Sequence, residues 1–210
     1  MHGSTFERSR ALLLATVLVG SSFIMPRIPV RWRVPAQAGG GALVALLTGS
    51  RIGLCPPRLW AGLRWGLSAG AAAATAIAAT APVPVVRLSM SARPLPRSAP
   101  AWLGLQIPVG TVWAEEAAFR AALATAAARG FGKSGGRLVQ AVAFGLSHIA
   151  DARAAGQPVS LTILVTGVAG WLFGWLADRS GSLAAPMLTH LAINETAAVA
   201  ALTIQRRSGS

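Results

Sequence analysis

The segment AWLGLQIPVGTVWAEEAAFRAALATAAA, residues 101–128, decides the fold class of this chain. It is longer than the roughly 20 residues that a helix needs to cross a hydrocarbon core. Only Glu115, Glu116 and Arg120 are charged within it. Ionisable groups are costly at membrane depth, and their usual place is a functional site or a protein-lined cavity. The segment therefore predicts a membrane helix that carries part of a site.

The rest of the chain has the same apolar character. Apolar residues make up 53% of the 210 residues and charged residues only 12%, and the mean hydropathy is +0.56. Soluble domains average about 25% charged residues, so most of this surface is expected to face lipid. Apolar runs recur at Ala11–Met25, Gly40–Gly49, Trp60–Ala81, Ala101–Ala128, Leu138–Ala150, Val159–Ala177 and Leu183–Ile204. We predict an all-α fold, a polytopic transmembrane bundle of about seven helices within a range of six to eight.

A stretch rich in proline and arginine, Pro82–Pro100, divides the chain. Its prolines exclude one continuous helix. All the polar motifs described below follow it. We therefore predict N-terminal scaffold helices over residues 1–100 and a catalytic transmembrane core over residues 101–210.

Two features of the first part concern its architecture. Gly62, Gly66 and Gly70 form a small-xxx-small pattern, which is expected to pack one helix closely against another within the bundle. The first apolar run is expected to be a retained span rather than a signal peptide. Proline and basic residues separate it from the nearest A-x-A triplet, Ala36–Ala38.

The net charge of +13 raises the question of nucleic-acid binding. The basic residues, however, are spread over the loops between apolar runs, where they suit anionic lipid headgroups. We expect the lipid bilayer as a partner, no nucleic acid, and a multi-pass protein of the cell membrane, of bacterial plasma-membrane type. Cys55 is the only cysteine, which excludes an intramolecular disulfide and a thiolate metal cluster.

The motif EEAAFR places two acids and a base on one helix. Residues four apart share a face, so Glu116 and Arg120 are expected to form a structural ion pair. Glu115 points about 100° away from Glu116 and has no cation four residues on. This division leaves Glu115 for chemistry. The alternative is that both acids belong to an ion-pair network that holds helices together.

Two further motifs place histidines in apolar helices. In FGLSH, Phe144 and His148 lie four residues apart on one face, and in HLAIN the same holds for His190 and Asn194. A lone histidine of this kind is usually a satisfied core residue. Polar groups on three separate apolar helices are better explained by a shared site.

Carboxylate, imidazole and amide groups together can hydrolyse a peptide bond. Glu115 can act as general base on a water molecule that His148 helps to orient or deprotonate. His190 and Asn194 can then donate hydrogen bonds to the developing oxyanion. No cofactor is needed for this chemistry. The alternative is a zinc site with Glu115, His148 and His190 as ligands, although no H-E-x-x-H pair is present. A serine nucleophile at Ser147 is disfavoured, because helix neighbours diverge by about 100°.

At these residues the chain resembles the CPBP intramembrane protease family, which includes the CAAX prenyl endopeptidases and the bacterial Abi proteins. The family's marks are E-E-x-x-x-R, F-x-x-x-H and H-x-x-x-N/D, in that order on separate transmembrane helices. Here they read Glu115–Arg120, Phe144–His148 and His190–Asn194. The resemblance covers roughly residues Ala101–Ile204.

The resemblance implies an all-helical fold with a catalytic cavity that opens within the membrane. It implies Glu115 as the water-activating glutamate, His148 as its partner, and His190 with Asn194 at the oxyanion. The family was long described as metalloproteases, and the resemblance favours a metal-free glutamic endopeptidase mechanism.

We therefore expect an intramembrane endopeptidase that hydrolyses a peptide bond in a membrane-associated protein or peptide. The main rival is a non-catalytic membrane scaffold or bacteriocin-immunity-type interaction protein, in which the polar cluster is structural. A transporter is a third option, because intramembrane acids also serve ion pathways. The variant Glu115→Gln separates these classes: an endopeptidase loses cleavage, while a scaffold keeps its function.

Overall fold

The computed structural model describes residues 2–208, and helices account for nearly all of this range. The long helices are α1 (His2–Ile24), α2 (Val30–Leu47), α3 (Arg58–Thr80), α6 (Ala124–Ser147), α8 (Val159–Ser180) and α9 (Ala184–Ser208). The shorter elements are η1 (Met25–Arg27), α4 (Pro84–Ser91), α5 (Ala99–Ala101), α7 (Ile149–Ala154) and two π-wound helices, η2 (Trp102–Trp113) and η3 (Glu116–Leu123). Residues 2–208 contain no strand, and the predicted all-α fold class is confirmed.

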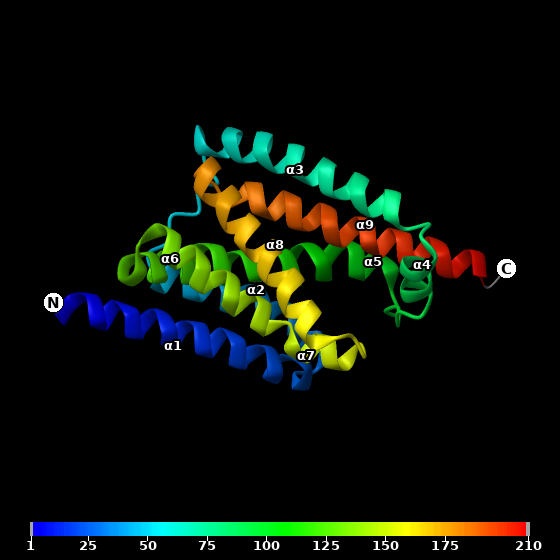
Figure 1. Cartoon of the computed structure of the whole chain (residues 1–210), viewed down its shortest axis with the longest axis horizontal. Coiled ribbons are helices and arrows are strands. Elements are labelled where there is room, and N and C mark those ends of the chain that lie inside the picture. The colour runs from blue at the N-terminus through cyan, green and yellow to red at the C-terminus, as the bar shows by residue number, and fades with distance from the viewer. Residues whose placement is uncertain (1, 209–210) are drawn as a thin grey trace.

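Helices α1, α3 and α9 run roughly along the long axis of the molecule, and α8 crosses the view obliquely (Figure 1). The closest pairs are α3 with α9, α6 with α8, and α1 with α6. Helix α1 forms one edge of the view and α3 the opposite edge. Helix α9, which carries the HLAIN motif, packs against both α3 and α8.

Each of the seven apolar runs lies on a helix of this bundle. The run from residue 101 to 128 is carried by η2, η3 and the start of α6, which follow one another without a loop. The chain then turns at Gly132, whose φ of +72° interrupts α6. Beyond this turn, a Cβ on Gly136 would lie 2.6 Å from the Ala128 nitrogen, so the two arms of α6 meet backbone to backbone.

Within residues 2–208, three helices are long and apolar enough to cross a membrane: Thr5–Arg27, Val159–Ser180 and Ala184–Arg207. A fourth is added if α3 and α4 count as one span, which is bent by 95°. This bend falls within the proline-rich stretch, where no continuous helix was predicted. Large apolar side chains face outwards on these helices, among them Leu13 at 66% exposed and Leu164 at 63%. Such an exposed apolar surface suits a lipid environment.

The glycines of α3 pack against α9, as predicted for the interior of the bundle. A Cβ on Gly62 would lie 3.0 Å from Ala184 Cβ, and a Cβ on Gly66 would lie 2.9 Å from the Ala185 carbonyl oxygen. Only glycine permits so close an approach of two backbones. Scaffold helix α3 is thus in direct contact with the helix that carries His190. The functional division at residue 100 stays a prediction.

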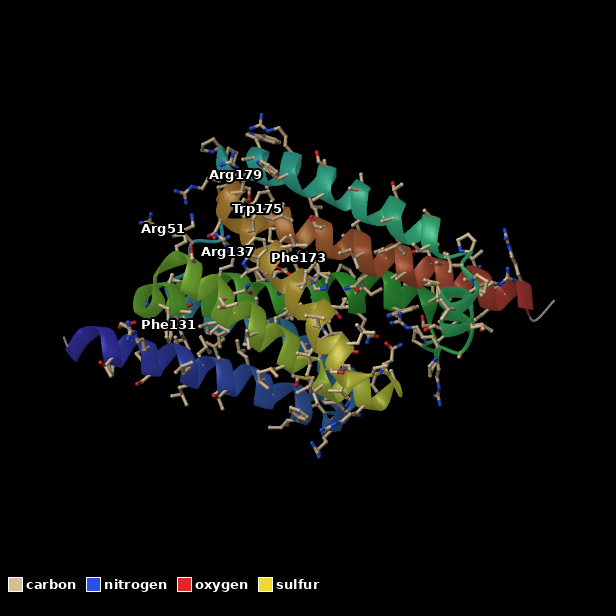
Figure 2. All side chains as sticks on the ribbon, viewed as in Figure 1. Arg51, Phe131, Arg137, Phe173, Trp175 and Arg179 are labelled. Carbon is tan, nitrogen blue, oxygen red and sulfur yellow. The ribbon has the colours of Figure 1, made fainter. Side chains whose placement is uncertain are left out.

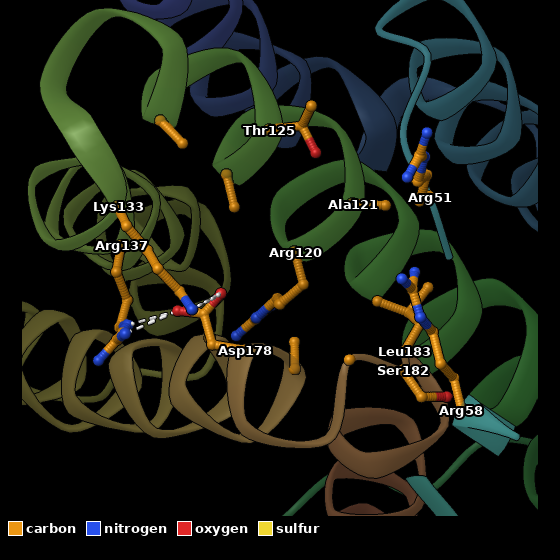
Figure 3. Close-up of a pocket in the computed structure, with 15 residues that line it drawn as sticks. Arg51, Arg58, Arg120, Ala121, Thr125, Lys133, Arg137, Asp178, Ser182 and Leu183 are labelled. Carbon is orange, nitrogen blue, oxygen red and sulfur yellow. Dashed lines mark hydrogen bonds and ion pairs between the residues drawn. The ribbon is translucent and has the colours of Figure 1, made fainter. Parts of the chain in front are cut away.

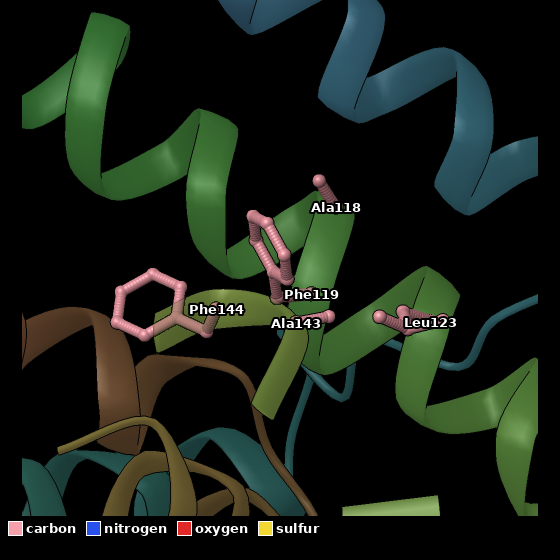
Figure 4. Close-up of a cluster of buried hydrophobic side chains, with 5 residues drawn as sticks. All are labelled: Ala118, Phe119, Leu123, Ala143 and Phe144. Carbon is pink, nitrogen blue, oxygen red and sulfur yellow. The ribbon is translucent and has the colours of Figure 1, made fainter. Parts of the chain in front are cut away.

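A buried apolar cluster lies between η3 and α6 (Figure 4). Its members are Ala118, Phe119, Leu123, Ala143 and Phe144. The rings of Phe119 and Phe144 meet edge to face, with centroids 5.2 Å apart. This cluster fixes the EEAAFR helix against the FGLSH helix, so two of the three motifs are held together by apolar packing.

Candidate active site

The first motif lies where the two π-wound segments meet. Helix η2 ends at Trp113 and η3 begins at Glu116, with Glu115 at the junction. Windings of the i→i+5 type are uncommon and recur at functional sites. From Glu116 to Leu123 every residue of η3 is buried, so this stretch forms the centre of the bundle.

Glu116 is completely buried and has two charged or polar neighbours. Its Oε1 accepts a hydrogen bond from His190 Nδ1 at 2.8 Å. The same oxygen lies 3.3 Å from Arg120 Nη1, and neither side chain of this ion pair is exposed. A charge buried this deeply is tolerated when it is paired and hydrogen-bonded. Glu116 therefore links η3 to α9 and orients the His190 ring.

Glu115 is placed differently. Its side chain is 28% exposed, and its Oε2 lies 3.9 Å from His190 Nε2, beyond hydrogen-bonding distance. This oxygen is itself buried and has no hydrogen-bond partner among the described residues. The His190 ring thus has one carboxylate on each side. Glu116 is engaged in hydrogen bonding and ion pairing, whereas Glu115 keeps an uncommitted acceptor atom.

Aromatic rings form the walls around this group. Phe173 of α8 stacks on the His190 ring with centroids 5.0 Å apart and planes 26° apart. The Arg120 guanidinium lies over Phe144 at 3.8 Å and over Phe173 at 5.0 Å. These contacts replace part of the hydration that the buried cation has lost.

His148 caps the C-terminal end of α6 and is half buried. Its Nδ1 donates to the Phe144 carbonyl oxygen at 2.8 Å, which leaves Nε2 as the acceptor of the neutral ring. The Phe144 ring meets the His148 ring at 4.6 Å and the His190 ring at 6.3 Å. Phe144 thus stands beside both histidines, and no hydrogen bond or ion pair within residues 2–208 links His148 directly to Glu115 or His190.

Asn194 lies one turn after His190 on α9 and is half buried. Within the described part of the chain, no hydrogen bond or ion pair connects its side chain to the other site residues. The structure therefore brings Glu115, Glu116, Arg120 and His190 into one group. His148 is connected to this group by the Phe144 ring, which contacts both histidine rings. Asn194 is placed near it only because it lies one turn after His190 on α9.

The residues of the alternative zinc set, Glu115, His148 and His190, are not gathered around one point in this structure. Among the described residues, no three His, Cys, Asp or Glu side chains are grouped closely enough to hold a metal ion. The Nδ1 atom of His148 and that of His190 both point at protein acceptors, so Nε2 is the ring nitrogen that each histidine has left for a ligand.

Two residues of this region were missed in the sequence. Phe173 lies in an apolar run and has no polar neighbour that would mark it as a site residue. The only local signal is the pair of small residues, Gly170 and Gly174, on either side of it. Glu195 directly follows the HLAIN motif, and its Oε1 is buried without a hydrogen-bond partner among the described residues. Glu195 lines a separate, largely apolar cavity of about 590 Å³ beside α3, α4 and α9.

In a comparison with protein families, residues 97–196 match the model described as type II CAAX prenyl endopeptidase, Rce1-like. This segment contains all three motifs and begins at the end of the proline-rich stretch. No curated protein and no solved structure matches the chain.

Proposed function

We propose that this chain, which matches the Rce1-like family of type II CAAX prenyl endopeptidases over residues 97–196, hydrolyses a peptide bond by glutamate-activated water. The match confirms the resemblance drawn from the three motifs, and together with the candidate spans it supports a membrane protein of the CAAX-protease type. The proposed substrate is a membrane-associated protein or peptide, and the proposed location is the plasma membrane of a bacterial cell.

The observation that carries the mechanism is the unequal environment of two adjacent carboxylates. Glu116 is fully buried and engaged by Arg120 and His190, while Glu115 is 28% exposed with Oε2 uncommitted. A general base must be free to accept a proton and within reach of water. The partly exposed Glu115, which has one uncommitted oxygen, suits this role better than Glu116, which is fully buried and ion-paired.

In the proposed reaction, Glu115 takes a proton from water as the water oxygen attacks the carbonyl carbon of the scissile bond. The carbonyl oxygen becomes an oxyanion in a tetrahedral intermediate. The carbon–nitrogen bond then breaks, and the proton held by Glu115 passes to the departing amine. No covalent bond to the protein forms at any step.

The two histidines and the asparagine have supporting roles in this proposal. His148, with Nδ1 held by the Phe144 carbonyl, presents Nε2 as an acceptor that orients the attacking water. His190 and Asn194 donate to the oxyanion. His190 can donate through Nε2 only when both ring nitrogens carry protons, with Glu116 accepting from Nδ1.

The test is a mass-spectrometric survey of protein termini in cells that express the wild type or Glu115→Gln at equal levels. Glutamine keeps the shape of the side chain but cannot take the proton. New termini that require Glu115 support the proposal, and a cut reproduced with purified wild-type protein and the identified substrate assigns it to this chain.

A matched control is Glu7→Gln. The side chain of Glu7 is also 28% exposed, but it pairs with Arg10 on α1, away from the site. Glu7→Gln is expected to give wild-type termini. If Glu115→Gln is folded in the membrane and its termini equal those of the wild type, Glu115 is not the base. The scaffold or immunity-type function then takes precedence.

A further inference from the structure

A strongly cationic cavity lies at the end of the bundle where α3 and α9 begin (Figure 3). Its volume is about 270 Å³. The basic side chains that line it are Arg51, Arg58, Arg120, Lys133 and Arg137. Asp178 is the one acid among its described lining residues. These cations come from three separate parts of the chain, so the fold, and not one basic segment, concentrates the charge.

Asp178 neutralises only one side of the cavity. Its Oδ2 accepts from Arg137 at 3.0 Å (Nε) and 2.6 Å (Nη2), and its Oδ1 lies 3.9 Å from Lys133 Nζ. On the other side, Arg51 and Arg58 have no ion pair or side-chain hydrogen bond with any described residue. Figure 3 shows Arg51 and Arg58 across the cavity from Lys133, Arg137 and Asp178. The cavity thus keeps an excess of positive charge.

Arg120 provides an independent sign of a missing ligand. Its side chain is fully buried, and Nε, Nη1 and Nη2 all lack a hydrogen-bond partner among the described residues. Arg120 Nη1 lies 3.3 Å from Glu116 Oε1 as an ion pair without a hydrogen bond, and the contacts with Phe144 and Phe173 are made with their rings, so the three nitrogens still lack an acceptor. A buried donor without an acceptor is destabilising. Because Arg120 lines the cavity, an anion bound there can accept from it.

The chemistry of the lining selects the class of anion. Guanidinium groups are planar donors whose geometry matches the oxygens of phosphate and carboxylate. The cavity holds several times the roughly 30 Å³ that one water molecule occupies in the liquid, which is enough for a tetrahedral phosphate group. The cations converge on one compact space, as a phosphate with several charged oxygens requires.

The position of the cavity in the molecule indicates where such a phosphate comes from. Tryptophans gather around the same end: Trp65 meets Trp175 with centroids 5.5 Å apart, and Arg179 lies over Trp65 at 5.9 Å. Figure 2 shows Arg51, Arg137, Trp175 and Arg179 towards this end of the molecule. Tryptophan is enriched at the membrane–water interface, where lipid headgroups and basic side chains meet.

We propose that this cavity is a phosphate-binding site that takes the headgroup of an anionic phospholipid, with Arg51 and Arg58 as the unpaired cations and Arg120 at its base. The proposal does not depend on peptide hydrolysis. The cavity and the candidate active site share Arg120, which lines the one and pairs with Glu116 in the other.

The test is native mass spectrometry of the purified full chain in detergent, titrated with dioleoyl phosphatidic acid, dioleoyl phosphatidylcholine or inorganic phosphate. The wild type is expected to retain phosphatidic acid in preference to phosphatidylcholine. The double variant Arg51→Gln/Arg58→Gln is expected to weaken phosphatidic acid binding on the order of thirtyfold, at about a factor of five per cation. Asp178→Asn, which frees Lys133 and Arg137, is expected to strengthen it severalfold.

The matched control is Arg31→Gln/Arg153→Gln. It removes two exposed cations from α2 and α7 that have no ion pair with a described residue. This control is expected to bind as the wild type does.

Inorganic phosphate that binds with the same dependence on Arg51 and Arg58, and displaces phosphatidic acid, would keep the anion site but assign it to a soluble phosphate compound. Equal retention of both lipids, or equal weakening in the control, would overturn the proposal. If the Arg51/Arg58 variant does not fold, weaker or unchanged binding by Asp178→Asn would overturn it as well.

Discussion

The buried pair of Glu116 and Arg120 gives a prediction about stability that is separate from catalysis. Each residue is replaced by methionine, singly and together. Either single change leaves one buried charge without its partner, because neither side chain of the pair is exposed. Breaking a buried pair in this way costs about 3–5 kcal/mol in the free energy of unfolding. Two independent losses would therefore add to about 6–10 kcal/mol.

The double variant is expected to behave differently, because no unpaired charge remains. Replacing a whole buried pair by apolar residues is often neutral or stabilising by about 1–4 kcal/mol. Two losses offset that gain. The hydrogen bond from His190 to Glu116 at 2.8 Å contributes about 1.5–3 kcal/mol as a charged hydrogen bond. The contact of Arg120 with Phe144 at 3.8 Å contributes about 0.5–2 kcal/mol. We expect the double variant to lie within about 4 kcal/mol of the wild type.

The assay is unfolding of the purified protein in mixed micelles by titration with sodium dodecyl sulfate, followed by circular dichroism. The expected signature is that the double variant is more stable than either single variant. Glu115→Gln is the comparison, and it should stay within about 1 kcal/mol of the wild type because its side chain is partly exposed. Additive losses in the double variant, or single losses below about 1 kcal/mol, would refute the view that Glu116 and Arg120 stabilise each other as a buried pair.

Three further outcomes are expected. Gly66→Leu should lower the unfolding free energy by about 1–3 kcal/mol or more, since its Cβ would lie 2.9 Å from α9. Gly20→Leu, with open space around its Cβ, should not; equal effects would contradict the tight α3–α9 packing. Phe173→Leu removes the ring stacked on His190 at 5.0 Å and should slow cleavage of an identified substrate on the order of tenfold to a hundredfold, with circular dichroism unchanged. Prolonged treatment with a zinc chelator should leave cleavage intact. Activity lost on chelation and restored by zinc would instead support Glu115, His148 and His190 as metal ligands.

Local features of the site could be predicted from the sequence because they depend on helix spacing. The i,i+4 relation of Glu116 and Arg120 puts them on one face, and the structure contains their contact at 3.3 Å. The same rule put Phe144 beside His148, whose rings meet at 4.6 Å. The helices themselves followed from the length of the apolar runs. Only some of the helices in residues 2–208 are long and apolar enough to be full membrane spans. Helix α2 starts among arginines, and the apolar run that begins at residue 138 is short.

Long-range relations could not be predicted in this way. Residue spacing does not predict which carboxylate accepts the hydrogen bond from His190. Glu116 and His190 are 74 positions apart and meet only because the fold brings α9 next to Glu116. Phe173 is an ordinary apolar residue in sequence, and only the fold places it against an imidazole. The cationic cavity was also hidden, because Arg51, Arg58 and Arg137 lie in different loops or helix ends, and only their assembly concentrates the charge.

The position of His190 depends on α3, a helix in the part of the chain that was predicted to be scaffold. A Cβ on Gly66 would lie 2.9 Å from Leu188 Cβ, and a Cβ on Gly70 would lie 3.2 Å from Ala192 Cβ. These contacts bracket His190 on α9, so the glycine face of α3 sets how closely α9 can approach and at which register. A shift of α9 by one residue would rotate His190 about 100° away from the two glutamates. Close backbone packing by the N-terminal helices is therefore a physical condition for the His190–Glu116 hydrogen bond.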